Sequence, residues 1–441
     1  MKLFYFLLST IFLSINVYAQ SNANALSPEQ KQKLRVLGVQ AIQEVIFESD
    51  IDLSDSEDVK RFVSEILQTQ ISEETTPDAI SDITNIITSS IVAIAASDTA
   101  IDLPTVVEAT ASEATKTTIN TIANLNSDIN GDGVVDERDI QEMANAAASG
   151  ASAGALSASS QTNLDISEIV EAASSGSSSG TVEAAVEGNL NVADMVEATS
   201  SGSTSGIVGT AASIANDING DGVVDEKDFA TFIDASSKGS VSGAIESVNS
   251  AGDINNDGIV NELDVLSVLE ATASGVSGGA VQSSIEMASD INFDGVVDEQ
   301  DIIAISETVA TSVTNNIINE AVSDGDLAVS IDAQTALESS VNAVSESILE
   351  AIIDKSDTTI EELSEIVTSI ADAQAATAEA NELDADAIGN IVAENVELNI
   401  VEEAETTETA DDGGELPIVE TPPDDTTLVD DPSNYLLENN Q

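Results

Sequence analysis

One twelve-residue pattern occurs four times in the chain, and it limits the possible folds more than any other feature. It reads Asp-Ile-Asn-Gly-Asp-Gly-Val-Val-Asp-Glu-Arg-Asp at 128–139 and returns at 217–228, 253–264 and 290–301. Each copy has oxygen-bearing side chains at its first, third, fifth, ninth and twelfth positions and glycine at the sixth. Oxygen ligands at this spacing, with a glycine for the sharp bend, let a loop wrap around one Ca²⁺. We therefore expect four calcium-binding loops.

The predicted ligands of each loop are five side chains and the backbone carbonyl of the seventh residue, with the ninth residue binding directly or through water. In chain order they are Asp128, Asn130, Asp132, Val134, Asp136, Asp139, Asp217, Asn219, Asp221, Val223, Asp225, Asp228, Asp253, Asn255, Asp257, Ile259, Asn261, Asp264, Asp290, Asn292, Asp294, Val296, Asp298 and Asp301. Asn261 stands where the other loops have aspartate, so the third loop should bind Ca²⁺ most weakly. The valines at the eighth position (135, 224, 260 and 297) are expected to pack inward and to join paired loops by a short strand.

A longer helical repeat contains these loops. Aspartate or asparagine followed by a helical phrase recurs along the chain, and apolar residues within the phrase are spaced by three and four. The anchors are Asp102, Asp139, Asp165, Asn191, Asp228, Asp264, Asp301 and Asp332. The pattern predicts an all-α helical repeat array in which each anchor caps the following helix and, in four repeats, also closes a loop.

A phrase of small residues follows most anchors, for example Ala146, Gly150 and Gly154. Two interpretations remain open. A flexible Ser/Gly turn between two short helices is slightly favoured, because each glycine costs about 1 kcal/mol in a helix. Alternatively, the glycines form one stripe of a continuous helix and allow a close approach of a neighbouring backbone.

Composition narrows the possible functions. The chain has 81 acidic and 11 basic residues, a net charge of −70, and no cysteine, histidine or tryptophan. Disulfides, imidazole catalysis and the usual zinc sites are thereby excluded, and nucleic acid and anionic membranes do not fit as partners. Fifteen carboxylates at ligand positions would repel one another without metal, so we favour structural over regulatory Ca²⁺.

The chain divides into five predicted segments. Residues 1–19 resemble a secretory signal peptide, which predicts a secreted, periplasmic or cell-surface protein, and no transmembrane segment is expected after it. A helical region follows at 20–125, calcium-binding helical repeats at 126–320, and a helical region without loops at 321–400. The acidic, proline-containing stretch 401–441 is predicted to be a disordered tail.

The loops resemble the repeat of type I dockerin modules, which are related to the EF-hand. The shared sequence motif is Asp-Ile-Asn-Gly-Asp-Gly-Val-Val-Asp-x-x-Asp-Ile, with aspartate closing the loop. The resemblance implies Ca²⁺ binding and docking to cohesin modules of scaffolding proteins. Two positions before the closing aspartate, which help to select the cohesin in many dockerins, are Glu137-Arg138, Glu226-Lys227, Glu262-Leu263 and Glu299-Gln300 here.

These observations lead to two functional hypotheses. The first is a secreted calcium-binding repeat protein in which Ca²⁺ stabilises a structural, adhesive or spacer array. The alternative is a dockerin-like assembly protein linked to polysaccharide degradation. The protein partner would be a cohesin-like module or a second copy of the chain, and no enzymatic activity is expected.

Overall fold

The computed structural model shows a helical array. It describes residues 28–48, 51–125, 128–129, 133–160, 165–214, 226–251, 253–254, 259–287, 296, 298–323, 331–355 and 359–392. Within those ranges the chain forms helices joined by turns and contains no strand, so the all-α prediction is confirmed. The predicted signal peptide and acidic tail lie outside the described residues.

The helices are mostly 19 to 26 residues long. They are α2 (Pro28–Glu48), α3 (Ser56–Gln70), α4 (Pro77–Ala95), α5 (Leu103–Leu125), α6 (Glu137–Ser159), α7 (Ile166–Gly188), α8 (Val192–Ile214), α9 (Glu226–Ala251), α10 (Glu262–Glu286), α11 (Glu299–Ser323), α12 (Ala333–Lys355) and α13 (Ile360–Ala380). A short helix at 385–392 follows.

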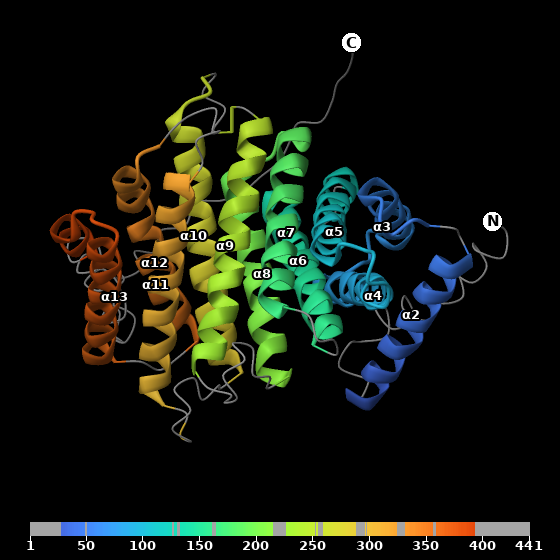
Figure 1. Cartoon of the computed structure of the whole chain (residues 1–441), viewed down its shortest axis with the longest axis horizontal. Helices are drawn as coiled ribbons and strands as arrows, with labels where there is room; N and C mark the ends of the chain where they lie inside the picture. The colour runs from blue at the N-terminus through green and yellow to red at the C-terminus, as the bar shows by residue number, and fades with distance from the viewer. Residues whose placement is uncertain are drawn as a thin grey trace, which may run out of the picture. The chain divides into compact units, whose positions relative to one another are not determined.

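The helices form two layers. Each helix makes its most extensive contacts with the helix two places away, so even-numbered helices form one layer and odd-numbered helices the other. Figure 1 shows the succession from α2 and α3 in blue to α13 in red. From α4 onward, helices next to each other in sequence pack across the two layers, and α7 and α8 are joined by only three residues, 189–191. Such a short connection makes successive helices antiparallel and helices of one layer parallel.

Glycine pairs hold the parallel neighbours together. A Cβ on Gly202 would lie 2.1 Å from the carbonyl oxygen of Asn145, and one on Gly206 would lie 2.2 Å from that of Ser149. Both partners advance by four residues, which confirms the parallel direction of α6 and α8. The same relation joins Gly150 and Gly154 to α4, Gly176 and Gly180 to α5, Gly239 and Gly243 to α7, and Gly275 and Gly279 to α8.

The favoured turn interpretation of the small-residue phrases is therefore wrong. Residues 146–154, for example, lie inside the unbroken helix α6, so each repeat contains one long helix and not two short ones. Close backbone contact, which only a residue without a Cβ permits, offsets the low helix propensity of glycine.

Hydroxyl groups join the layers where the side chains are small. The Ser203 hydroxyl lies 2.7 Å from that of Ser152 and 3.1 Å from that of Ser174. The Ser236 hydroxyl lies 3.2 Å from that of Ser174 and 3.0 Å from that of Thr204. All five residues are buried, so this chain of hydrogen bonds connects α6, α7, α8 and α9 inside the array.

One described helix, α4, is long and apolar enough to cross a membrane by length and composition alone. Most of its apolar window is buried in the array, where it packs against α6 and α2. We expected no such helix after the predicted signal peptide, because threonines and serines interrupt the apolar residues of this stretch. Its packing is that of a core helix.

Candidate metal centres

The four predicted loops lie at the N-terminal ends of α6, α9, α10 and α11. Since α6 and α10 are parallel members of one layer, the first and third loops lie at one edge of the array. Helix α9 is antiparallel to α10, so its start, which contains the closing residue Asp228 of the second loop, lies at the opposite edge. The starts of consecutive loop-bearing helices thus do not lie side by side, which does not fit the pairing that we predicted.

The first loop is closed by hydrogen bonds to its first and last residues. Asp128 Oδ2 accepts from the backbone N–H of Gly133 at 3.0 Å. Asp139 accepts from the N–H of Ile129 at 2.6 Å through Oδ1 and from that of Asp136 at 3.0 Å through Oδ2. Gly133 has a φ of +88°, a left-handed conformation that a side chain disfavours, as the predicted bend requires.

The third loop repeats this arrangement. Asp264 accepts from the N–H of Ile254 at 2.7 Å and from that of Asn261 at 2.8 Å. In the fourth loop, Asp301 Oδ2 accepts from the N–H of Asp298 at 2.8 Å. The closing aspartates Asp139, Asp228, Asp264 and Asp301 are all buried. The first, third and fourth loops are thereby attached to the packed start of the following helix through one carboxylate.

The anchor aspartates of these loops are not the N-caps that we predicted. Asp136 caps α6 by accepting from the N–H of Arg138 at 3.0 Å, and Asn261 caps α10 by accepting from that of Leu263 at 2.8 Å. The anchors Asp139 and Asp264 lie three residues later and complete a capping box. In loops one and three the ninth loop residue is therefore the N-cap, and the helix begins at the tenth.

Repeats without a loop follow the prediction. Asp165 caps α7 through the N–H of Ser167 at 3.0 Å, and Asn191 accepts from the N–H of Ala193 at 3.2 Å. A loop therefore shifts the start of the helix by three residues relative to the anchor. The sequence signal for this shift was the aspartate or asparagine at the ninth position, which we had assigned only to metal binding.

The eighth-position valines do not pack inward. Val135 and Val260 are 45% and 52% exposed, and neither belongs to a strand. Since α6 and α10 begin at the edge opposite to the starts of α9 and α11, neither valine lies beside the start of the next loop-bearing helix. Val224 and Val297 lie outside the described residues.

The described residues include only part of each predicted ligand set. They are Asp128, Val134, Asp136, Asp139, Asp228, Asp253, Ile259, Asn261, Asp264, Val296, Asp298 and Asp301. The other ligands, among them every residue at the third and fifth positions, lie outside the description. Within the described part, no three acidic side chains converge as a metal site would require. The ligand assignments therefore remain predictions.

The residues present nevertheless suit a hard divalent cation. Every predicted ligand atom is oxygen, which Ca²⁺ prefers. A carboxylate oxygen that accepts one backbone N–H retains a second lone pair for a metal ion. Asp136 and Asn261 each use a side-chain oxygen to cap the following helix. This agrees with a ligand at the ninth loop position that binds Ca²⁺ through water.

A second recurring carboxylate lies within the helices and was not recognised from the sequence. It is the acidic residue that follows six of the anchors (102, 165, 191, 228, 264 and 301), and it contacts the next helix of the same layer. Ser274 donates to Glu197 at 2.6 Å, Lys238 pairs with Glu171 at 2.8 Å, and Asn316 donates to Asp234 at 3.1 Å. Glu108, Glu270 and Glu307 bond Ser175, Ser339 and Ser369 in the same way.

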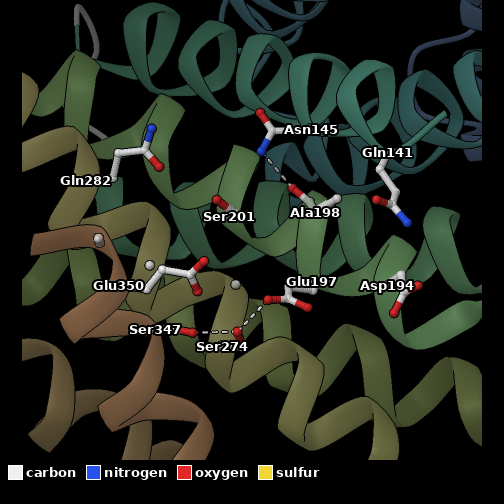
Figure 2. A pocket seen from close by; sticks show the side chains of 13 residues that line it. Gln141, Asn145, Asp194, Glu197, Ala198, Ser201, Ser274, Gln282, Ser347 and Glu350 are labelled. Carbon is white, nitrogen blue, oxygen red and sulfur yellow. Dashed lines mark hydrogen bonds between the residues drawn. The ribbon is translucent and has the colours of Figure 1, made fainter. Parts of the chain in front are cut away.

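Figure 2 shows one such contact at a hollow of about 400 Å³ on the even-numbered layer. Ser274 bonds both Glu197 and Ser347, while Asn145 donates to the carbonyl oxygen of Ala198 at 3.0 Å. Four of the polar side chains around the hollow, one from each helix, thus connect α6, α8, α10 and α12. The contacts explain these groups as part of the helix packing.

Comparison with known families agrees with the loop pattern. The type I dockerin domain family matches residues 215–269 and 251–310, two overlapping segments that contain the second, third and fourth loops. The resemblance seen in the sequence is therefore confirmed for this part of the chain. The first loop lies outside the matched residues. A search of curated proteins found no match.

Proposed function

We propose that the protein is a secreted, non-enzymatic calcium-binding repeat protein whose Ca²⁺ ions stabilise an extracellular structural, adhesive or spacer array. The observation that carries the proposal is the position of the closing aspartates. Asp139 and Asp264 are buried against the helix starts and hold the loop backbone through two hydrogen bonds each. Metal binding to these carboxylates therefore adds to the stability of the array, because a ligand that binds only the folded state stabilises it.

The charge of the chain supports a structural role. A protein with a net charge of −70 repels itself when compact, and four bound Ca²⁺ ions would offset part of that repulsion where carboxylates are most concentrated. Cysteine is absent, so disulfides do not constrain the unfolded state. Calcium would then have the stabilising role that disulfides have in many secreted domains.

Calorimetric titration of the mature chain with Ca²⁺ tests the proposal. We expect four sites with dissociation constants of about 10⁻⁴–10⁻³ M, typical of extracellular modules. Asp264→Ala should remove one site and lower the melting temperature in Ca²⁺. The matched control is Asp165→Ala, which removes the same repeat anchor from a helix without a loop: it should weaken α7 and leave the stoichiometry at four. Sub-micromolar binding, or an unchanged stoichiometry in Asp264→Ala, would contradict the proposal.

The second candidate function is docking to a cohesin-type partner in a polysaccharide-degrading assembly. The family match over residues 215–310 favours it. Its test is a pull-down with immobilised cohesin modules, in which binding should disappear in the Asp217→Ala, Asp253→Ala double variant. If the cohesin modules retain neither the wild-type protein nor the double variant, the structural role is the better account.

A further inference from the structure

Apolar side chains are exposed at the edge of the array where α6, α8 and α10 begin. Val134 and Val135 precede α6, Ile259 and Val260 precede α10, and each of the four is at least 45% exposed. Among the exposed large apolar side chains described beyond α2, only that of Val296 lies at the opposite edge. Grouped exposed apolar residues of this kind commonly mark an interaction surface.

The main chain at these two places has no partner among the described residues. Asp136 and Asn261, which follow the two valines, have extended backbone angles, with φ of −144° and −152°. No hydrogen bond joins the backbone N–H or C=O of Val135 or Val260 to another described residue. An extended segment whose main-chain groups are unpaired at an edge can pair with another chain.

The two segments cannot pair with each other within one molecule. Helix α8 lies between α6 and α10 in the layer and follows the short turn 189–191 without a calcium loop. Neighbouring helix axes are about 8–10 Å apart, so Val135 and Val260 are separated by about 16–20 Å, far beyond the reach of a hydrogen bond. By contrast, α9 and α11, which follow the second and fourth loops, are direct neighbours.

A second copy of the chain offers matching segments at the same separation. Both segments carry two apolar residues at the same loop positions, Val134-Val135 and Ile259-Val260. When two copies face each other across a two-fold axis in the plane of this edge, both segments of one copy meet both segments of the other at once, because their separation is identical. Main-chain groups supply the hydrogen bonds of antiparallel pairs, so the contact is self-complementary.

We propose that two molecules dimerise through this edge, with Val135 and Val260 of each copy forming short antiparallel bridges to the same segments of the other. The apolar side chains of both segments then become buried. The contact is closed by its two-fold symmetry, so the assembly ends at a dimer. Two short segments bury less than the standard interface of about 1,200 Å², so the dimer is weak and forms at high protein concentration.

Calcium controls this association. Asp136, Glu137 and Glu262 lie beside the paired segments and are at least partly exposed. Two such acidic edges repel each other unless cations offset the charge, so dimerisation requires Ca²⁺ in the first and third loops. The requirement for Ca²⁺ rests on the proposed function, and the inference goes beyond that function by giving these two loops a partner.

Sedimentation velocity of the mature chain tests the inference. In Ca²⁺ the weight-average sedimentation coefficient should rise with protein concentration to the value of a dimer, and in EGTA it should stay at that of a monomer. The Val135→Asn, Val260→Asn double variant should remain monomeric in Ca²⁺, while its Ca²⁺ stoichiometry by calorimetry equals that of the wild type. The matched control is Val296→Asn, which changes an exposed loop valine at the opposite edge and should leave dimerisation intact.

Disulfide cross-linking tests the geometry, because the chain has no cysteine of its own. The Cβ atoms of directly opposed residues in an antiparallel pair lie about 4.5–5.5 Å apart, close to the separation in a disulfide. The Val135→Cys, Val260→Cys double variant should therefore give a covalent dimer on oxidation in Ca²⁺. The Val296→Cys variant controls for random collisions and should stay largely monomeric.

Three results would overturn the inference. The first is Ca²⁺ binding by calorimetry without dimerisation at any concentration, which leaves the proposed function intact. The second is a dimer that the double asparagine variant retains, or equal cross-linking of the Val296→Cys control. The third is a monomer whose binding to phosphatidylglycerol vesicles or to a cohesin module is lost in the asparagine variant, which makes that surface the partner. Absence of Ca²⁺ binding, by contrast, would contradict the proposed function and the Ca²⁺ requirement together.

Discussion

At the scale of single residues, glycine determines how closely parallel helices approach. Ten glycines in α6 to α10 lie against backbone carbonyl groups of the helix two places earlier, with no room for a methyl group. The backbone cannot yield as the end of a flexible side chain can. A substitution here separates two helices over their whole contact, whereas most surface substitutions act locally.

We expect Gly202→Ala to destabilise the protein by about 1–3 kcal/mol or more, the usual cost of overpacking a tight interface. Thermal unfolding in Ca²⁺ measures this. Gly209→Ala is the control in the same helix, because its Cβ would meet only the flexible Met287 side chain, 3.9 Å away. It should stabilise α8 by up to about 1 kcal/mol through helix propensity. Equal effects of the two substitutions would contradict the close-packing account.

A second residue-scale prediction concerns pH. Desolvation and then the charge of Glu246 raise the pKa of Glu108 above its ordinary value, while Ser175 and Lys60 act in the opposite direction. The folded state therefore binds this proton more tightly than the unfolded state. Stability falls as pH rises from the unfolded pKa through the folded one, and the loss is complete above both.

Glu108→Gln should accordingly raise the melting temperature at pH 7 and have little effect near pH 4, where Glu108 is protonated. Scanning calorimetry at the two pH values measures the difference. Glu171 occupies the same repeat position but pairs with Lys238. Glu171→Gln should give no gain at pH 7, and a gain equal to that of Glu108→Gln would argue against local desolvation as the cause.

At the scale of helices, apolar residues spaced by three and four positions were enough to predict an all-α array and its repeat. They were not enough to separate one long helix from two short ones. Local propensity penalises residues such as Gly176 and Gly180, and the contact that compensates comes from α5, at Glu108 and Ser112. That partner lies two repeats earlier in the chain, so no local pattern revealed it.

In the metal loops, too, local features could be predicted from the sequence and features that depend on distant neighbours could not. Glycine at the sixth position predicted the left-handed Gly133 correctly, because this requirement is local. The inward packing of Val135 failed, because it depended on which loops are neighbours, and the antiparallel order of the helices decides that. The shift of the N-cap to Asp136 was readable in principle from the aspartate itself.

The buried hydroxyl chain gives a prediction at this scale. Ser203→Ala removes the hydrogen-bond partner shown for Ser152 and should cost about 1–3 kcal/mol, the penalty for an unsatisfied buried group. Ser200 is buried in the same helix and has no hydrogen-bond partner within the described part of the chain. Ser200→Ala should be neutral or stabilising in denaturant unfolding. A larger loss of stability for Ser200→Ala than for Ser203→Ala would refute the structural role of the hydroxyl hydrogen bonds.

At the scale of the whole molecule, the array combines two kinds of repeat. Tight glycine contacts connect helices within each layer, and the loops connect successive helices at the edges. Repeat arrays gain stability mainly from neighbouring units, so a change in one part need not spread evenly. Calcium should therefore stabilise the loop-bearing part most and the flanking helices least.

Hydrogen–deuterium exchange with and without Ca²⁺, followed by mass spectrometry, tests this central claim most directly. Removing Ca²⁺ with EGTA should greatly increase exchange across residues 126–301 and change it far less in α3, α4, α12 and α13. Exchange that is unaffected by EGTA, or that rises equally in all helices, would contradict the claim that Ca²⁺ in these loops stabilises this part of the array.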